Sequence, residues 1–322
     1  MKEIVSKLPL DLIEKELTPD KFMRDTNKGG NQIYILTAHD SPNIMHEIGR
    51  LREITFRAAG GGTGEETDID EYDTCEVPYK QLIVWDPDHK EILGGYRYIL
   101  CDKYGLKPNG EPNLATEHLF HFSDKFKKEF LPKTLELGRS FVQPDYQSSK
   151  AGAKALFALD NLWDGLGALT VEHPEMKYFF GKVTMYTHFN TEARNLILCF
   201  LKKHFSDKDG LMYPKEECIL NIDFSKYEPI FSGTDFKEDY KILSKNVRKY
   251  GENIPPLVNA YMSLSPTMRT FGTAINDEFG DVEETGIIVT IDDIYEAKKD
   301  RHIKTYIKRK WFQRKRMGVK IH

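Results

Sequence analysis

Residues 134–147 read TLELGRSFVQPDYQ, and this stretch places two charged side chains inside an apolar strand pattern. Glu136 and Arg139 interrupt a run of leucine, phenylalanine and valine that is typical of a β-strand. Charges inside a strand are costly unless they are paired or lie at a functional site. Because the two residues are three positions apart, a regular strand would point them to opposite faces. We expect a β-bulge at Gly138 that brings both into one cleft and turns a backbone N–H toward an oxyanion.

Strands and helices alternate on both sides of this stretch. Strands are predicted at residues 31–38, 80–86, 91–102, 178–186 and 285–292, and helices at 41–60, 150–169 and 191–205. The helix at 41–60 has Ser41 as its expected cap, Pro42 at its first position and glycines at its end. The alternation predicts an α/β or mixed α+β domain. We place that domain at residues 30–295, between an N-terminal extension (1–29) and a C-terminal tail (296–322).

Length, apolar content and cysteine spacing exclude several classes of protein. The chain has 322 residues, which is enough for one large domain or two, and its 40% hydrophobic content is ordinary for a globular protein. Its densest apolar run, Leu196 to Leu201, is far shorter than a membrane span, and the acidic residues near the start argue against a signal peptide. Four cysteines without a CxxC pair predict buried thiols in a cytoplasmic protein, without disulfides or a metal site.

Several standard sites are excluded by their motifs. There is no GxxxxGK[ST] phosphate loop, no GxSxG nucleophile elbow and no HExxH metal motif. Basic residues outside the tail are too dispersed for a nucleic-acid-binding module. What remains is a set of charged residues in unusual positions. Arg52 lies at the margin of a buried helix face, Arg97 lies in an apolar strand, and the loop over 60–73 is rich in carboxylates, which together predict a polar cleft.

The tail is strongly basic. From Lys298 to His322 there are eleven lysine or arginine residues and one aspartate, a net +10, so that residues 1–297 carry −14 and the whole chain −4. Trp311 and Phe312 stand among these charges. Cations mixed with large aromatics suit the surface of an anionic membrane, so we predict peripheral association with the inner face of the cytoplasmic membrane.

The order of these motifs resembles a known family. LRxxxF on a first helix, a loop ending in DxxD, an arginine on the next hairpin and ExxR on a strand resemble the acyl-homoserine-lactone synthase branch of the GNAT acyltransferases. LELGRSFVQPDYQ is similar to the ELGRSxVxPxYR signature of the ornithine–acyl-carrier-protein N-acyltransferases and the hemolysin-like proteins, which include enzymes that acylate glycine. The resemblance extends over residues 30–292 and implies a GNAT fold, with a mixed, mostly antiparallel central sheet flanked by helices.

The resemblance also implies roles for individual residues. It implies catalytic roles for Glu136 (as general base), Arg139 and Arg52, substrate binding by Asp70, Asp73, Phe56 and Arg97, and binding of the donor phosphopantetheine by Ser140, Phe141, Val142, Gln147, Lys150 and Gly152. Lys150 stands where the GNAT pyrophosphate loop has its first glycine. This departure weakens the expected grip on coenzyme A and favours an acyl-carrier protein as donor.

The expected reaction is transfer of a fatty acyl chain, with or without a 3-hydroxyl group, from acyl-carrier protein or acyl-CoA to the amine of an amino acid. Glycine or ornithine would be the acceptor and an N-acyl amino acid lipid the product, with no permanently bound cofactor. Two alternatives stay open. An acetyl-CoA-dependent small-molecule N-acetyltransferase would have a short, closed pocket and a tight coenzyme A site. A non-catalytic lipid-surface binding protein would tolerate changes at Glu136.

Overall fold

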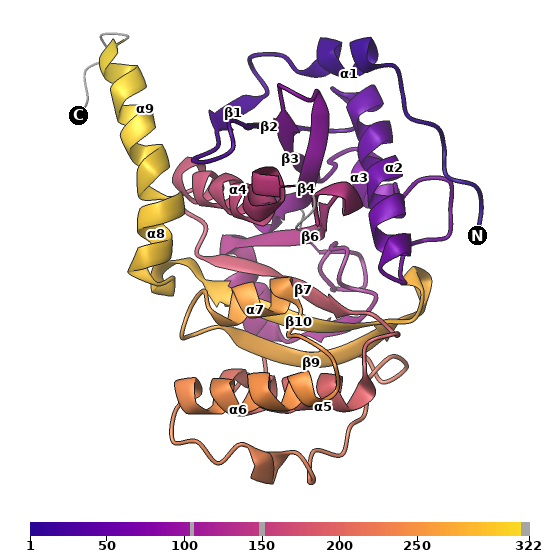
Figure 1. Cartoon of the computed structure of the whole chain (residues 1–322), viewed down its shortest axis with the longest axis vertical. Helices are drawn as coiled ribbons and strands as arrows, with labels where there is room; N and C mark the ends of the chain where they lie inside the picture. Colours follow the sequence, from indigo (N-terminus) through magenta and orange to yellow (C-terminus); the bar gives the residue numbers. More distant parts are fainter. Residues whose placement is uncertain (104–105, 148–151, 317–322) are drawn as a thin grey trace. The chain divides into compact units, whose positions relative to one another are not determined.

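The structure, a computed structural model of the chain, describes residues 1–103, 106–147 and 152–316, with only the backbone at 103, 152–156 and 312–316. These residues form two compact units, coloured along the chain in Figure 1. The first unit combines residues 1–100, 135–177 and 294–322, and the second combines residues 101–134 and 178–293. Each unit has its own antiparallel strands and its own helices.

The first unit is built on antiparallel strands in the order β1-β2-β3-β4-β6. They are β1 (Phe22–Asp25), β2 (Gln32–Leu36), β3 (Lys80–Asp86), β4 (Glu91–Leu100) and β6 (Thr134–Val142). The last four confirm the strands predicted in these parts of the chain. β1 lies in the segment that the sequence predicts as an extension, and it pairs with β2 as part of the sheet.

The helices of the first unit are α1 (Leu10–Glu16), α2 (Pro42–Ala58), α3 (Glu71–Thr74), α4 (Gly152–Glu172), α8 (Glu296–His302) and α9 (Lys304–Arg316). Two glycines of α4 allow close packing on its neighbours. A side chain at Gly165 would come within 2.7 Å of Leu82 of β3, and one at Gly167 within 2.6 Å of the His302 carbonyl oxygen of α8. Helix α4 therefore packs closely both on the sheet and on α8.

The start of α2 corrects one expectation. Pro42 occupies the first position as predicted, but the Ser41 side chain makes no capping hydrogen bond and donates to Asp40 instead. The carboxylate of Glu16, at the end of α1, accepts from the backbone N–H of Ile44 at 2.8 Å. A carboxylate at a helix N-terminus satisfies unpaired N–H groups and complements the helix dipole. The cap therefore comes from another helix.

The described part of the basic tail, residues 296–316, is almost entirely helical and packs on α4 of the same unit. His302 Nδ1 lies 2.8 Å from a carboxylate oxygen of Asp164 in α4, and both residues are buried. Lys310 forms an ion pair with Glu172, at the end of α4, at 2.7 Å. Residues 296–316 thus use part of their positive charge within the protein.

The second unit has three antiparallel strands in the order β7-β10-β9 and a separate two-stranded pair. Its elements are β5 (Phe120–Phe122), β7 (Tyr178–Met185), β8 (Met212–Pro214), β9 (Arg269–Asn276), β10 (Val282–Thr290), α5 (Thr191–Phe205), α6 (Phe236–Lys249) and α7 (Pro256–Met262). The helix predicted at 191–205 and the strands predicted near 178–186 and 285–292 are confirmed. The mixed, mostly antiparallel α/β class predicted from the sequence is confirmed as well.

Candidate active site

Glu136 lies in the middle of β6 with only 1% of its surface exposed. The hydroxyl of Tyr79, just before β3, donates a hydrogen bond to its carboxylate. Tyr79 is itself fully buried, and its ring centre lies 5.2 Å from the guanidinium of Arg97. The carboxylate is therefore held by a tyrosine whose ring also contacts a cation.

A β-bulge interrupts β6 after Gly138, two residues beyond Glu136. Gly95 of β4 pairs with Phe141 and Arg97 pairs with Gly138, so two residues of β6 oppose one of β4. Arg139 is one of the two, and its φ of 46° lies in the left-handed region. That conformation costs about 1–2 kcal/mol for a residue with a side chain. The predicted bulge is confirmed, but the strained residue is Arg139 rather than Gly138.

The bulge aims Arg139 at the acidic loop. Its Nε donates to Asp68 at 3.0 Å, and its guanidinium lies 3.6 Å from Asp70. Arg97 in turn donates to both carboxylate oxygens of Asp70 at 2.7 Å. Because Arg97 also lies over the tyrosine that binds Glu136, one continuous network joins Arg139 to Glu136.

Arg52 forms the buried end of this network. Its Nη1 donates to Asp73 at 3.1 Å and its Nη2 to the side-chain oxygen of Gln81 at 2.5 Å. Gln81 completes a triangle by donating to Asp73 at 2.9 Å. Arg52 and Asp73 are both 0% exposed. This pair anchors the acidic loop to α2 and β3.

The DxxD spacing has a local cause. The Asp70 carboxylate accepts from the Asp73 backbone N–H, and the Asp73 carboxylate accepts from the Asp70 backbone N–H, each at 3.2 Å. This reciprocal pair is a capping box at the start of α3. The short helix therefore fixes the direction of both carboxylates toward the arginines.

Burial and neighbouring charge both act on these groups. Burial by itself would raise the pKa of Asp73, but Arg52 and Arg97 outweigh it and lower that pKa to about 2. Burial disfavours the charge of Arg97, yet Asp73 and Asp70 raise its pKa above the ordinary arginine value. Burial lowers the pKa of Arg52, although an arginine stays protonated at neutral pH. The Arg52–Asp73 and Arg97–Asp73 pairs are therefore ionised under physiological conditions.

Three of the residues predicted to bind the donor, Ser140, Phe141 and Val142, form the end of β6, and Gln147 follows in the turn after it. Phe141 is buried, and a side chain at Gly95 would come within 3.1 Å of its ring. Ser140 and Val142 are half-buried. Gln147 donates from Nε2 to the carbonyl oxygen of Val142 at 2.6 Å and so closes the turn after the strand.

Three predicted residues remain, and the structure describes two of them. Phe56 is buried on α2, one turn beyond Arg52. Gly152 is the first residue of α4. Lys150 lies outside the described residues.

Sequence reasoning missed three members of the network: Tyr79, Gln81 and Asp68. Tyr79 and Gln81 flank the first residue of an apolar strand, and both are buried. The available signal was a polar side chain next to apolar strand residues, because such a group needs a partner when it is buried. Asp68 is one of six carboxylates in its loop, so no pattern separates it from its exposed neighbours.

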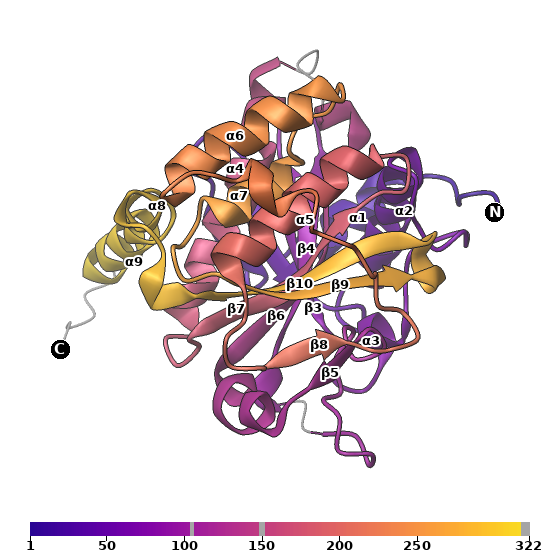
Figure 2. The ribbon, with the colours of Figure 1, turned by 90° about the horizontal axis from the view of Figure 1, so that it is seen from below.

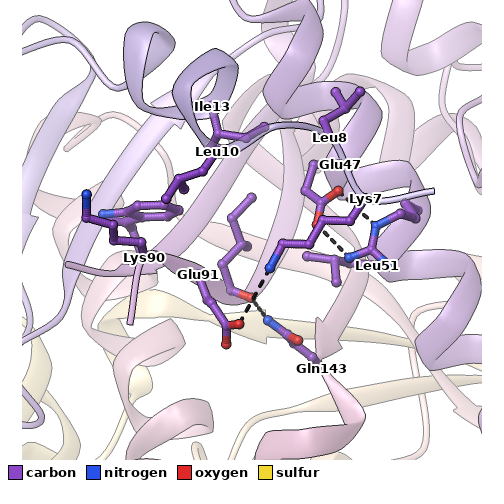
Figure 3. A pocket seen from close by; sticks show the side chains of 12 residues that line it. Lys7, Leu8, Leu10, Ile13, Glu47, Leu51, Lys90, Glu91 and Gln143 are labelled. Carbon is purple, nitrogen blue, oxygen red and sulfur yellow. Dashed lines mark hydrogen bonds and ion pairs between the residues drawn. The ribbon is translucent and has the colours of Figure 1, made fainter. Parts of the chain in front are cut away.

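Each unit also contains a cavity. The cavity in the first unit (Figure 3), of about 20 Å³, is lined by the N-terminal segment with Lys7 and Ile13, by Glu47 of α2 and by Gln143. That volume holds about one water molecule. The cavity in the second unit is much larger, about 360 Å³, and lies between the end of α5 and strand β9. Its walls are mainly apolar, with Leu198, Leu201, Met212, Ile222, Phe224 and Phe271.

Comparison with known proteins gives the family. Residues 51–156 match the acetyltransferase (GNAT) domain. A glycine N(alpha)-acyltransferase of Bacteroides thetaiotaomicron is 62% identical over 307 residues, which cover 95% of this chain and 91% of that protein. The chain is a GNAT-family acyltransferase. The acyltransferase is also 59% identical to a glycine N(alpha)-acyltransferase of Phocaeicola vulgatus, over 96% of this chain and 94% of that protein.

Some solved structures are faintly similar to this acyltransferase. A CoA-dependent acyl-homoserine lactone synthase is similar over 48% of this chain and 67% of that chain, with 15% sequence identity and a TM-score of 0.31.

Within the described part of the acyltransferase, no helix combines the length and the apolar character needed to cross a membrane.

Proposed function

We propose that this N-acyltransferase moves a fatty acyl chain from the thioester of an acyl-carrier protein to the amine of glycine. The observation that carries the proposal is the high identity, over nearly the whole chain, to two proteins named glycine N(alpha)-acyltransferase. The same names favour glycine over ornithine as acceptor. The product is an N-acyl glycine, an aminolipid.

Glu136 is the general base of this proposal. An amine must lose a proton to attack a thioester, and a positioned carboxylate accepts it directly or through a water molecule. The hydrogen bond from Tyr79 supports this role, because it holds the carboxylate in one orientation. The amine nitrogen forms a bond to the thioester carbon, the carbon–sulfur bond breaks, and the thiol of the carrier leaves.

Arg52 and Arg139 have different roles in this proposal. Arg52 has no exposed surface and is bound by Asp73 and Gln81, which favours a role in locking the acidic loop over contact with the acceptor. Arg139 has 14% of its side chain exposed and lies in the bulge, so it is the candidate to attract the carboxylate of glycine. The backbone N–H groups of the bulge are the candidate oxyanion hole.

The choice of donor rests on the turn after β6. Lysine at position 150 in place of the usual glycine disfavours a tight coenzyme A site, whereas the start of α4 can still hold the single phosphate of a phosphopantetheine arm. The purified enzyme should therefore be offered glycine or ornithine with one of three donors: hexadecanoyl-carrier protein, hexadecanoyl-CoA or acetyl-CoA. The products are then identified by mass spectrometry. N-acyl glycine from the carrier-bound donor is expected. Product formed only with acetyl-CoA would favour a small-molecule acetyltransferase, and no product from any donor would favour the lipid-binding alternative.

The apolar cavity of the second unit is the candidate site for the acyl chain. Its volume of about 360 Å³ falls within the range of ligand sites, about 300–1,000 Å³. Ile222 lines it and is half-buried, so Ile222→Trp would reduce its volume without disturbing the core. The variant is expected to lose about tenfold or more in kcat/KM for hexadecanoyl donors while keeping octanoyl transfer.

Ile219 provides the matched control for this experiment. It is 39% exposed and does not line the cavity, so Ile219→Trp adds the same bulk outside it. The control should keep the chain-length preference of the wild type. An Ile222→Trp enzyme with unchanged preference would place the acyl chain elsewhere.

Association with an anionic membrane is proposed for α9. Ile307 and Trp311 are 48% and 42% exposed, one helical turn apart, with the exposed Lys308 between them. Such a mixed face suits the lipid interface. Ile307→Ser with Trp311→Ser should abolish sedimentation with phosphatidylserine vesicles and leave transfer from a soluble donor intact.

Point substitutions are preferable to truncation here, because deleting α8 and α9 would remove His302 and take that partner away from the buried Asp164. Tyr250→Ser, which removes an aromatic side chain of similar exposure in the second unit, should sediment as the wild type does. Equal sedimentation of the double variant, or none of the wild type, would contradict membrane association through α9.

A further inference from the structure

Helix α6 carries a row of four exposed cations: Lys237, Lys241, Lys245 and Arg248. Their spacing of four, four and three residues places them within about 80° of one another around the helix axis and along about 16 Å of its length. We call these four residues the α6 basic row. It is a linear charged surface in a chain whose net charge is −4.

Within the part of the chain that the structure describes, the α6 basic row has no ion-pair partner. No carboxylate among the described residues lies within ion-pair distance of its four members. The acidic residues of the same helix are engaged elsewhere. Glu238 accepts from the Thr234 backbone N–H at 2.8 Å, and Asp239 is buried against His204 at 2.8 Å.

In the C-terminal tail, by contrast, several cations have partners within the protein. Lys304 forms an ion pair with Asp300 at 2.6 Å, and Lys310 forms one with Glu172 at 2.7 Å. Arg309 donates to the Asp25 carbonyl oxygen at 2.7 Å. The tail has more cations, but several of those that the structure describes are bound within the protein, whereas no ion pair is found for the four of α6.

Helix α6 is also held rigidly. It begins at the Asp235 cap, and its opposite face buries Leu243 and Val247. The ring centres of Phe236 and Phe200 lie 5.4 Å apart where α6 runs beside α5 (Figure 2). A fixed helix presents its charges in one geometry and loses little entropy on binding.

We propose that the α6 basic row is the docking surface for the acidic carrier protein that delivers the acyl chain, an inference that rests on the proposed donor. Complementary charge attracts such a partner and fixes its register. A bilayer is a poorer match, because no large apolar side chain is highly exposed among the four cations, and the 43% exposed Tyr250 lies beyond the last turn of α6. Charge in a regular row without apolar anchors fits the acidic face of a protein helix.

The full-length enzyme with all four residues changed to glutamine tests this surface. Its KM for hexadecanoyl-carrier protein at low salt should rise about tenfold or more, and the salt dependence of kcat/KM should flatten, because charged surfaces accelerate association mainly at low ionic strength. Its kcat/KM for hexadecanoyl-pantetheine, which carries no protein, should stay at the wild-type value. That second substrate reports whether the variant is folded.

A charge-matched control changes four scattered exposed lysines to glutamine: Lys15, Lys128, Lys133 and Lys208. The control should keep the wild-type KM for the carrier protein. An unchanged KM in the α6 variant would overturn the docking inference alone, as would loss of vesicle binding in that variant with normal use of the carrier protein. A wild-type enzyme that accepts hexadecanoyl-CoA but not the carrier-bound donor would overturn the proposed donor and the docking surface together.

Discussion

Replacing Glu136 by glutamine is expected to lower kcat/KM for acyl transfer by about 100- to 10,000-fold, the range typical of a lost general base. Glutamine keeps the volume of the side chain, and its carbonyl oxygen can still accept the hydrogen bond from Tyr79. The fold should therefore persist, and the loss should appear in kcat. Steady-state rates with purified enzyme, glycine and acyl-carrier protein measure the effect.

Glu71→Gln is the matched control for this substitution. Glu71 is exposed on α3, close in sequence to the acidic residues of the network. Its substitution by glutamine makes the same chemical change at the surface. Its turnover should equal that of the wild type. Wild-type turnover of Glu136→Gln, with circular dichroism showing both variants folded, would remove Glu136 from the mechanism.

The second large effect concerns stability. Arg52→Met is expected to lower the free energy of unfolding by about 3 kcal/mol, because it removes the nearer of the two arginines that pair with the buried carboxylate of Asp73, the other being Arg97 at 3.3 Å. The loss is large since neither residue of the pair has any exposed side-chain surface. Urea unfolding followed by tryptophan fluorescence measures it.

Two further variants make this result interpretable. Arg52→Lys keeps the charge but loses the planar fork that reaches both Asp73 and Gln81, so an intermediate loss is expected. Arg248→Met makes the same change as Arg52→Met at an exposed position without an ion-pair partner, and should alter stability by no more than about 0.5 kcal/mol. Equal urea midpoints for Arg52→Met and Arg248→Met would show that the buried pair does not hold the loop.

Much of the site could be predicted from short windows of sequence. A charge inside an apolar strand is expensive wherever the strand lies, so Glu136 and Arg139 stand out without any knowledge of their neighbours. Their spacing of three residues demands an irregular strand, and the bulge is present. The position of helix α2 likewise follows from local periodicity and from Pro42 at its start.

Only the tertiary structure decided which opposite groups meet. Tyr79 reaches Glu136 across 57 residues, and Asp68 reaches Arg139 across 71. The neighbours of Asp68 are carboxylates of the same kind, so its selection depends on where the folded loop comes to lie. Local rules can state that a buried charge needs a partner, but the partner is chosen by packing between distant segments.

The C-terminal tail and helix α6 show the same difference between what the sequence determines and what the tertiary structure determines. By composition, the tail is the outstanding cationic region of this chain and α6 is an ordinary charged helix. Folding brings Glu172 of α4 to Lys310 of the tail, while no described carboxylate is brought to Lys241. The number of charges in each segment can therefore be read from the sequence. Whether they stay available to a partner depends on distances between atoms that are remote along the chain, because the attraction between two charges falls as they move apart and is screened by solvent.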